Sequence, residues 1–325
     1  MKILAFETSC DDTSIAVFED NKLLFMDTMS QIRIHLETGW VVPEVAAREH
    51  ANNIFSVLDK VLSWTWVELK DIDYIAVTMT PWLIPSLLTW ITVARTLSNI
   101  LKVPLVEINH IEAHVFANYL ERNREDIKYP LVCLTVSGGH NEIYYMKDMF
   151  SFLKLWATTD DAAGEAFDKV AKMMWLGYPG WPIISKLALE YKQKPSFSLP
   201  RVFLDKDAFD FSFSGLKSAV KREVDNRGKA TWDLSLDDKR EISFEFQNAV
   251  IEVLAYKLIN AWKKKEVKTV MLAWWVSAND SLNELINDLS KKEGLNFLSP
   301  VKKVYSMDNA AMVGINAYYK IKNGL

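Results

Sequence analysis

Alternating and continuous runs of apolar residues mark the predicted strands of the chain. Residues 2–30 predict three strands joined by short polar turns, in the segments KILAFE, TSIAVFED and KLLFMDTMS. The segment 130–148, PLVCLTVSGGHNEIYYMKD, repeats the order of strand, small polar turn and strand. Two such hairpins, one opening each half, predict a duplicated α/β architecture with a ligand between two lobes.

Apolar residues at helical spacing fill much of the remaining chain. A strand-like run of apolar residues at 267–273 leads into Ser277-Ala-Asn-Asp280, which reads as the capped start of an amphipathic helix. The other expected elements are helices at 45–63, 86–101 and after Asn309, strands at 73–78, 104–109 and 302–306, and a mostly helical stretch from 150 to 265.

One uncharged stretch, Tyr74 to Ala94, is about long enough to cross a bilayer. Pro81 and Pro85 divide it into a strand, a turn and a helix. This division favours the core of a soluble protein over a membrane span.

Composition excludes several classes of protein. Half of the residues are hydrophobic and 25% are charged, which is typical of a globular chain. A net charge of -4 gives no support to nonspecific coating of nucleic acid or membranes. Cys10 and Cys133 are too few for a disulfide framework, which indicates the reducing cytoplasm. Glu7 interrupts the first apolar run, so no signal peptide is expected.

His110 and His114 are the first candidates for chemistry. If the segment NHIEAH is helical, the two imidazoles lie at i and i+4 on one face, a spacing that suits a transition metal. The metalloprotease motif has glutamate directly after the first histidine, and that order is not met here. Because such pairs also arise by chance on helices, the spacing alone leaves metal site and chance pair both open.

Two polar turns are candidates for ligand binding. Ser137-Gly-Gly139 could present backbone N–H groups to an anion, although a plain hairpin turn has the same composition. The turn Thr8 to Thr13 carries hydroxyls and carboxylates. Taken together with the histidine pair, these turns favour an adenylate or phosphate ligand with a metal.

Nine motifs, read in order, resemble the bacterial tRNA threonylcarbamoyladenosine-forming transferase family (TsaD). The motifs extend over nearly the whole chain and are ETSCDDTS, VVPEVAAREH, NHIEAH, VSGGH, DDAAGEAFDKVAK, GYP, FSFSGLK, VSAN and MDNAAM. The resemblance implies an α/β fold of the actin-like, sugar-kinase-like (ASKHA) class, with duplicated ribonuclease H-like lobes. The expected division is an N-terminal lobe at 1–106 and a C-terminal lobe at 107–325, with a mostly helical insertion at 150–265 and a last helix returning to the first lobe.

The resemblance also implies a reaction. The expected enzyme is a metal-dependent acyltransferase that moves a threonylcarbamoyl group from threonylcarbamoyl-AMP to N6 of the adenosine 3′-adjacent to the anticodon in tRNAs reading ANN codons. His110, His114 and Asp308 would hold one metal ion, most simply Fe(2+), with Zn as the alternative. The expected substrate contacts are Thr135, Val136, Ser137, Gly138, Gly139, Asp168, Trp181 and Asn279.

A role for Asp11 is a hypothesis of its own: its carboxylate positions or deprotonates the incoming adenine amine. The expected partners are tRNA, a TsaB-like paralogue and a TsaE-like ATPase, with no membrane. Two other readings are a metalloprotease and a noncatalytic scaffold of the same tRNA-modifying complex. The residue order around His110 disfavours the first, and retention of both histidines with Asp308 disfavours the second.

The tryptophans depart from the family pattern in a systematic way. Trp274 and Trp275 precede VSAN where the family has two glycines. The chain holds 12 tryptophans and 11 glycines, and these 23 residues of 325 restore the usual glycine share of ~7%. The hypothesis is that the source organism reads UGA as glycine and that the printed sequence translates it as tryptophan. The remaining positions are Trp40, Trp64, Trp66, Trp82, Trp90, Trp156, Trp175, Trp181, Trp232 and Trp262.

Overall fold

A computed structural model describes the chain except for residues 37, 159–160, 202–212 and 228–233. Trp232 therefore lies outside the described residues. Two compact units make up the fold: residues 1–127 with 300–325, and residues 128–299. The units divide the chain after Ile127 and join the C-terminal segment to the first unit. The predicted division into lobes between residues 106 and 107 stays a prediction.

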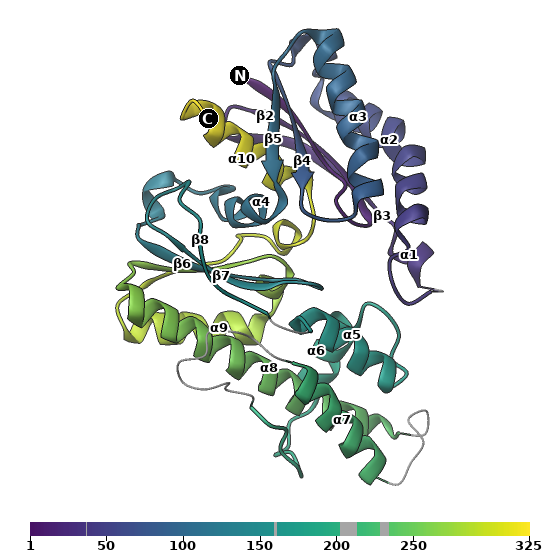
Figure 1. Ribbon diagram of the computed structural model, residues 1–325, viewed down its shortest axis with the longest axis vertical. Coiled ribbons are helices and arrows are strands. Elements are labelled where there is room, and N and C mark those ends of the chain that lie inside the picture. The colour runs from purple at the N-terminus through teal and green to yellow at the C-terminus, as the bar shows by residue number, and fades with distance from the viewer. Residues whose placement is uncertain (37, 159–160, 202–212, 228–233) are drawn as a thin grey trace. The chain divides into compact units, whose positions relative to one another are not determined.

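The first unit is a five-stranded sheet with helices on both faces (Figure 1). In it β1 pairs antiparallel with β2 and parallel with β4. Its strands are β1 (Lys2–Glu7), β2 (Asp12–Glu19), β3 (Lys22–Ser30), β4 (Tyr74–Thr80) and β5 (Leu105–Asn109), in the spatial order β3-β2-β1-β4-β5. Its helices are α1 (Ile32–His35), α2 (Pro43–Thr65), α3 (Ile84–Leu101), α4 (His110–Phe116) and α10 (Ala310–Lys322), with 3₁₀ turns at Leu69–Asp71, Ala117–Tyr119, Arg124–Asp126 and Lys303–Ser306.

Successive side chains of a strand point to opposite faces of the first sheet, and different helices cover the two faces. Leu4 and Phe6 of β1 point to the cluster that α2 and α3 complete with residues such as Val57 and Trp90. The opposite face packs against α10, where Gly314 lies so close to the Phe18 ring that a Cβ would overlap it. Both faces are therefore apolar, which explains the continuous rather than alternating hydrophobic runs.

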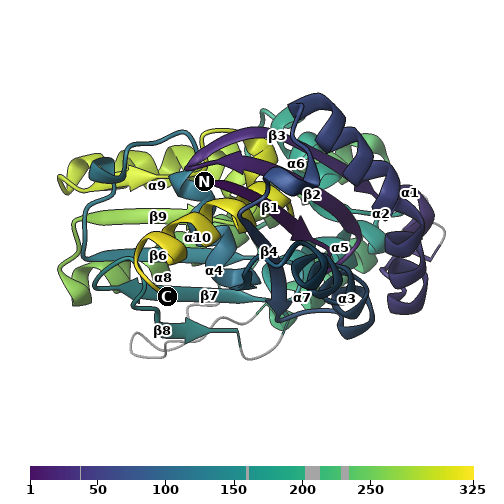
Figure 2. The ribbon, with the colours of Figure 1, turned by 90° about the horizontal axis from the view of Figure 1, so that it is seen from above.

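The second unit repeats the same strand order (Figure 2). Strand β6 pairs antiparallel with β7 and parallel with β9, as β1 does with β2 and β4. Its strands are β6 (Leu131–Val136), β7 (Asn141–Met146), β8 (Leu153–Ala157), β9 (Thr269–Ala273) and β10 (Asn296–Leu298), in the order β10-β9-β6-β7-β8. Read from β8, this is the order of the first sheet, so the predicted duplication is confirmed.

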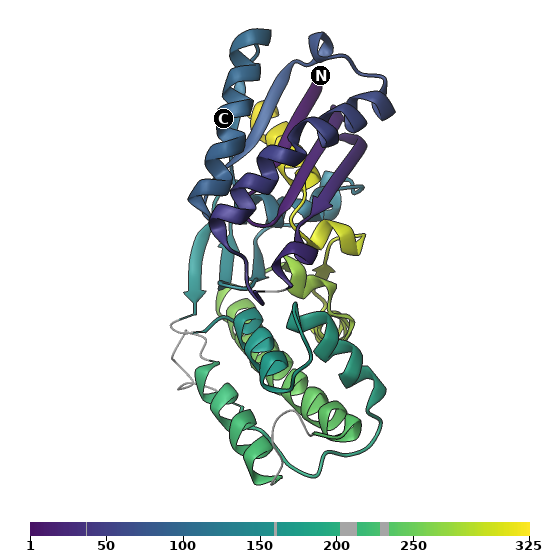
Figure 3. The ribbon, with the colours of Figure 1, turned by 90° about the vertical axis from the view of Figure 1, so that its right-hand side faces the viewer.

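Among the helices of the second unit, α6 packs along α8 and beside α5, and α5 lies against α7 (Figure 3). They are α5 (Ala163–Met173), α6 (Gly180–Glu190), α7 (Ser214–Asn226), α8 (Leu236–Lys265) and α9 (Asp280–Lys292), with a 3₁₀ turn at Trp275–Ala278. Among the described helices of the chain, none combines the length and the apolar character needed to cross a membrane.

One predicted element is wrong. Residues 302–306 were expected to form a strand, but Lys303–Ser306 is a 3₁₀ turn. Both Lys302 Nζ and Tyr305 Oη bond the carboxylate of Glu121, each at 2.6 Å. This anchoring holds the segment in a local turn, and a strand-like run of only five residues carries no information about it.

Candidate functional site

Helix α4 places the two predicted histidines side by side. Asn109 caps the helix, because its Oδ1 accepts from the backbone N–H groups of Ile111 at 2.9 Å and Glu112 at 3.2 Å. His110 and His114 then fall one turn apart on the same face, and both are fully buried. The helix assumed from the sequence is present.

Asp308 joins the pair from the far end of the chain. Its Oδ1 lies 2.9 Å from His114 Nε2 and 3.5 Å from His110 Nε2, while the two Nε2 atoms are 3.1 Å apart. All three ligand atoms lie within 4.8 Å of one another. Two imidazole nitrogens and a carboxylate oxygen facing one point form a donor set that fits a transition-metal ion. The structure thus brings the three predicted ligands together.

The segment around Asn309 fixes Asp308. Asn309 Nδ2 donates to the carbonyl of Met307 at 2.6 Å, and its Oδ1 accepts from Met312 N at 3.0 Å as the N-cap of α10. The next amide, Ala310 N, donates to Ser14 Oγ of β2 at 2.9 Å. Asp308 is therefore held on the sheet just before a capped helix.

Glu7 and Ser9 form a second layer behind His110. His110 Nδ1 lies 3.1 Å from Ser9 Oγ and 3.2 Å from Glu7 Oε2. Glu7 is itself held by Thr78 Oγ1 at 2.5 Å and Ser9 N at 2.6 Å. A hydrogen bond at Nδ1 leaves Nε2 to act as a ligand, which is the usual arrangement behind a metal-bound histidine. Sequence reasoning missed Glu7, although it lies in the motif ETSCDDTS with Asp11, and named Ser9 only as part of the polar turn Thr8 to Thr13.

The pKa values of these groups follow from burial and from their neighbours. Burial and the nearby His110 lower the pKa of His114 to about 4, so its imidazole is neutral at neutral pH and able to bind a cation. Burial favours a lower pKa for His110 too, but the charges of Glu7 and Asp308 and the hydrogen bond to Glu7 together outweigh it, and the pKa is raised. Burial acts to raise the pKa of Glu7, and the charge and hydrogen bond of His110 bring it below its usual value.

Asp11 lies in the β1–β2 turn, next to Asp12. Burial raises the pKa of Asp11, and the Asp308 charge adds to the effect. Burial and the adjacent Asp11 charge raise the pKa of Asp12 to about 8. His50 fixes this turn from α2, since its Nε2 lies 3.0 Å from the carbonyl of Cys10. His50 was also missed, although the motif VVPEVAAREH contains it.

The glycine turn of the second unit packs against the start of α5. Ser137 Oγ accepts from His140 N at 2.9 Å and from Gly139 N at 3.2 Å. Gly164 N donates to the Ser137 carbonyl at 3.3 Å, and Glu165 N donates to the Gly138 carbonyl at 3.1 Å. The backbone of Gly138 and Gly139 stays exposed, so this turn offers main-chain groups to a ligand.

Three other predicted contacts in this unit are buried. Thr135 and Val136 are fully buried in β6, and Thr135 Oγ1 donates to the Glu142 carbonyl at 3.3 Å. Asn279 is 4% exposed and caps α9 by accepting from Leu282 N at 2.8 Å. Its Nδ2 donates at 3.2 Å to Gln247 Oε1, a residue that sequence reasoning missed.

Asp168 and Trp181 meet at the start of α6. Asp168 Oδ1 accepts from Gly180 N at 2.7 Å. The Trp181 ring lies 4.4 Å from the Phe167 ring and 4.7 Å from the Trp275 ring, both edge-on. Burial raises the pKa of Asp168 to about 6 even though the Gly180 N–H lowers it. A partly desolvated carboxylate is therefore held beside an indole pair.

Replacement of Asp168 by asparagine should stabilise the fold in a pH-dependent way. The side-chain oxygen can still accept from Gly180, while the desolvated charge is removed. The raised pKa means that the stability contributed by protonated Asp168 is present below about pH 4 and is lost as the pH rises through about 6. Thermal unfolding of both proteins should show a Tm gain for Asp168→Asn at neutral pH that shrinks towards about pH 4. A gain independent of pH would contradict the burial argument.

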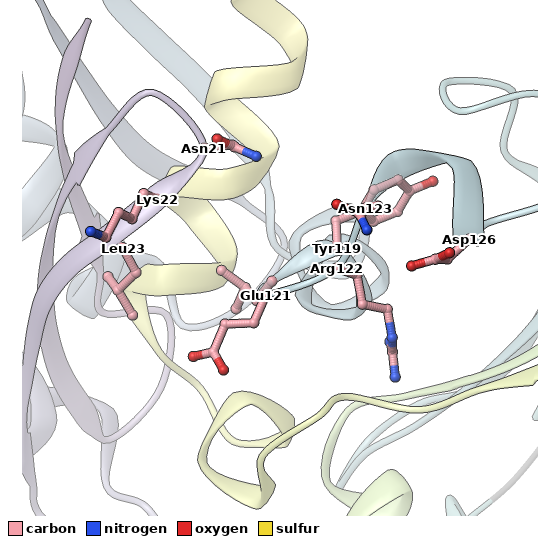
Figure 4. Close-up of a pocket in the computed structure, with 9 residues that line it drawn as sticks. Asn21, Lys22, Leu23, Tyr119, Glu121, Arg122, Asn123 and Asp126 are labelled. Carbon is pink, nitrogen blue, oxygen red and sulfur yellow. The ribbon is translucent and has the colours of Figure 1, made fainter.

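A separate cavity of about 510 Å³ lies in the first unit (Figure 4). It is formed between the β2–β3 turn and the segment after α4. Its lining residues are Asn21, Lys22, Leu23, Tyr119, Leu120, Glu121, Arg122, Asn123 and Asp126. None of the residues predicted for the site belongs to this lining.

Comparison with known proteins decides the family. The sequence profile of TsaD, tRNA N6-adenosine threonylcarbamoyltransferase, matches residues 22–315. The chain belongs to this family. It is 44% identical over 326 residues to the tRNA N6-adenosine threonylcarbamoyltransferase of Persephonella marina, covering 99% of this chain and 91% of that one. The enzyme of the same name from Staphylococcus epidermidis is 43% identical over 324 residues, covering 99% and 93%.

Solved structures show the fold alone. Full-length HypF in its phosphate- and nucleotide-bound form has a TM-score of 0.62 at 13% identity, covering 99% of this chain and 55% of that one. Component A of (R)-2-hydroxyglutaryl-CoA dehydratase from Acidaminococcus fermentans has a TM-score of 0.58 at 12% identity, with 99% of both chains covered. The expected actin-like, sugar-kinase-like fold is confirmed.

Proposed function

We propose that this chain transfers the threonylcarbamoyl group of threonylcarbamoyl-AMP to N6 of the adenosine 3′-adjacent to the anticodon in tRNAs that read ANN codons. The observation that carries the proposal is the convergence of His110, His114 and Asp308 in a chain that matches the transferase family over residues 22–315. Neither of the curated relatives described above is named as a protease or as a scaffold.

The first unit would supply the metal centre. When bound, an Fe(2+) or Zn ion would act as a Lewis acid towards the threonylcarbamoyl group. Glu7 and Ser9 hold the Nδ1 side of His110, so that its Nε2 faces His114 and Asp308. His114 contributes a neutral imidazole, because burial lowers its pKa to about 4.

The second unit would bind the adenylate. The exposed turn at Gly138 and Gly139 is suited to the phosphate, because a main-chain N–H such as that of Gly138 can neutralise an anion without a buried counter-charge. Asp168, whose carboxylate bonds Gly180 N, and Asn279, the N-cap of α9, would add polar contacts to the adenylate. Thr135 and Val136 lead into this turn from the end of β6, Ser137 braces it by accepting from Gly139 N and His140 N, and Trp181 occupies the remaining predicted contact position.

Asp11 would position or deprotonate the adenine amine. The pKa of its carboxylate is raised by burial, which strengthens it as a base. We expect Asp11→Ala to reduce transfer to background while Tm stays within about 2 °C of wild type, because removing a buried charge costs the fold little. Asp59→Ala, which removes an exposed carboxylate of α2, is the matched control and should retain full transfer. Unchanged turnover in Asp11→Ala would remove the residue from the mechanism.

The substrate and partner assignments are tested together. The anticodon loop is single-stranded, so its bases can be offered to a protein without opening a duplex. The protein, with glycine encoded at the tryptophan positions, is incubated with threonylcarbamoyl-AMP, a tRNA transcript, a TsaB-like paralogue and a TsaE-like ATPase. Nucleoside mass spectrometry should detect threonylcarbamoyladenosine only when this chain is present. Peptide cleavage without nucleoside modification would favour the metalloprotease, and product without this chain would favour the scaffold.

The same proposal places the reaction in the cytoplasm, where tRNA is found. Cys10 and Cys133 are both free thiols, which agrees with a reducing compartment.

A further inference from the structure

Four tryptophans adopt a backbone conformation that side chains disfavour. Among the described residues, eight that are not glycine have positive φ, and four of those are Trp66 (55°), Trp82 (139°), Trp175 (54°) and Trp274 (70°). A Cβ in this region is crowded by its own backbone, and a bulky aromatic residue is an outlier there. Tryptophan makes up 12 of 325 residues, so half of this set is far beyond its share.

Trp175 stands at the helix-end position that glycine normally occupies. After α5, the N–H of Trp175 donates to the Lys172 carbonyl at 3.2 Å, and the N–H of Leu176 donates to the Ala171 carbonyl at 3.0 Å. This pair of bonds is the Schellman motif, whose left-handed residue is most often glycine. Trp66 ends α2 in the left-handed region too, with φ 55° and ψ 27°. Both helices therefore end in the left-handed backbone conformation that glycine usually adopts at a helix C-terminus.

Trp274 and Trp275 fill space beside the glycine turn. Trp274 has positive φ and is 3% exposed directly after β9. The Trp275 ring lies so close to Gly164 that a Cβ on that glycine would overlap it. Gly164 itself bonds the Ser137 carbonyl. The indole thus occupies volume next to the exposed turn at Gly138 and Gly139, where the proposed function places the adenylate phosphate.

We infer that residues 66, 82, 175, 274 and 275 are glycine in the protein that the source organism makes, because that organism reads UGA as glycine. The codon UGA differs by one base from the glycine codon GGA and by one base from the tryptophan codon UGG, so the printed residue follows from the code used for translation. The glycine count of 11 agrees, since it is about half the typical share. Any other tryptophan of the printed sequence that is encoded by UGA would also be glycine in that protein. One part of this inference rests on the proposed function: that the adenylate uses the space which the indole rings of residues 274 and 275 would leave.

The direct test is peptide mapping by mass spectrometry on the protein purified from its source cells. We expect glycine in the peptides that contain positions 66, 82, 175, 274 and 275, with each peptide lighter by the mass difference between tryptophan and glycine for every replaced position it contains, so that the peptide with 274 and 275 is lighter by at least twice that difference. Tryptophan at any of these positions would overturn the inference. The result does not depend on catalysis, so it stays valid whether or not the chain transfers threonylcarbamoyl groups.

A matched pair of variants in the printed chain tests the backbone argument. Trp66→Gly removes a 92%-exposed indole from a left-handed residue, and we expect Tm to rise by about 2–4 °C. Trp64→Gly, in the last turn of α2, removes a ring stacked on Phe25 at 5.5 Å, and we expect Tm to fall. A fall in both would overturn the inference that residue 66 is built for glycine.

Discussion

Replacement of His114 by alanine is expected to abolish metal binding and reduce threonylcarbamoyl transfer by at least ~100-fold. The reason is that His114 supplies one of three ligand atoms gathered within 4.8 Å. Loss of a residue that only orients a ligand typically weakens metal affinity by about 10–100-fold, so loss of a ligand itself should reach the upper end or beyond. Metal content after loading and dialysis, measured beside transfer, gives the two readouts.

Glu112→Ala is the matched control for this prediction. Glu112 lies on the same helix between the two histidines, but its side chain is 29% exposed and pairs with Lys320 at 3.2 Å. It should keep its metal and its activity. A His114→Ala protein that retained stoichiometric metal would place the ion elsewhere.

Replacement of Gly164 by alanine is expected to cost about 1–3 kcal/mol of stability and to abolish adenylate binding. A Cβ at this position would lie 2.7 Å from the Ser137 carbonyl oxygen and 2.8 Å from Gly138 Cα. These are backbone atoms of the turn, so they cannot move aside as a flexible side chain would, and the strain persists even when residue 275 is glycine. Thermal unfolding measures the first effect, and titration with a non-reactive adenylate analogue measures the second.

Gly138→Ala separates folding from binding in the same turn. A Cβ at Gly138 meets nothing within 4 Å, and its φ is not positive. We therefore expect unchanged Tm and weakened adenylate binding, because the added methyl group would stand where the phosphate approaches. If Gly138→Ala bound the analogue as tightly as wild type, the turn would not be the phosphate site.

Local patterns predicted the parts of the fold that depend on local physics. The segments 2–30 and 130–148 gave the two hairpins, because a turn of small polar residues between apolar runs has few other outcomes. The segment 302–306 was assigned wrongly as a strand, because its conformation depends on Glu121, which lies far away in the sequence. The five residues themselves contain no sign of that contact.

The candidate site likewise has a part that local sequence predicted and a part that depends on residues far apart in the chain. The spacing of His110 and His114 indicated a shared helix face, but only the motif resemblance pointed to Asp308, which lies 194 positions from His114. Glu7, His50 and Gln247 were missed because each acts by orienting another residue, and no spacing in the sequence marks such a role. Trp66 and Trp175 are the converse case: the tryptophan and glycine counts raised a question, and the positive φ values of these two residues bear on it.

Anomalous X-ray scattering from crystals of the metal-loaded protein tests the central claim most directly. The account predicts one anomalous peak at about 2.0–2.2 Å from His110 Nε2, His114 Nε2 and an Asp308 carboxylate oxygen. A fully loaded, active protein whose peak lay away from these three atoms would contradict it.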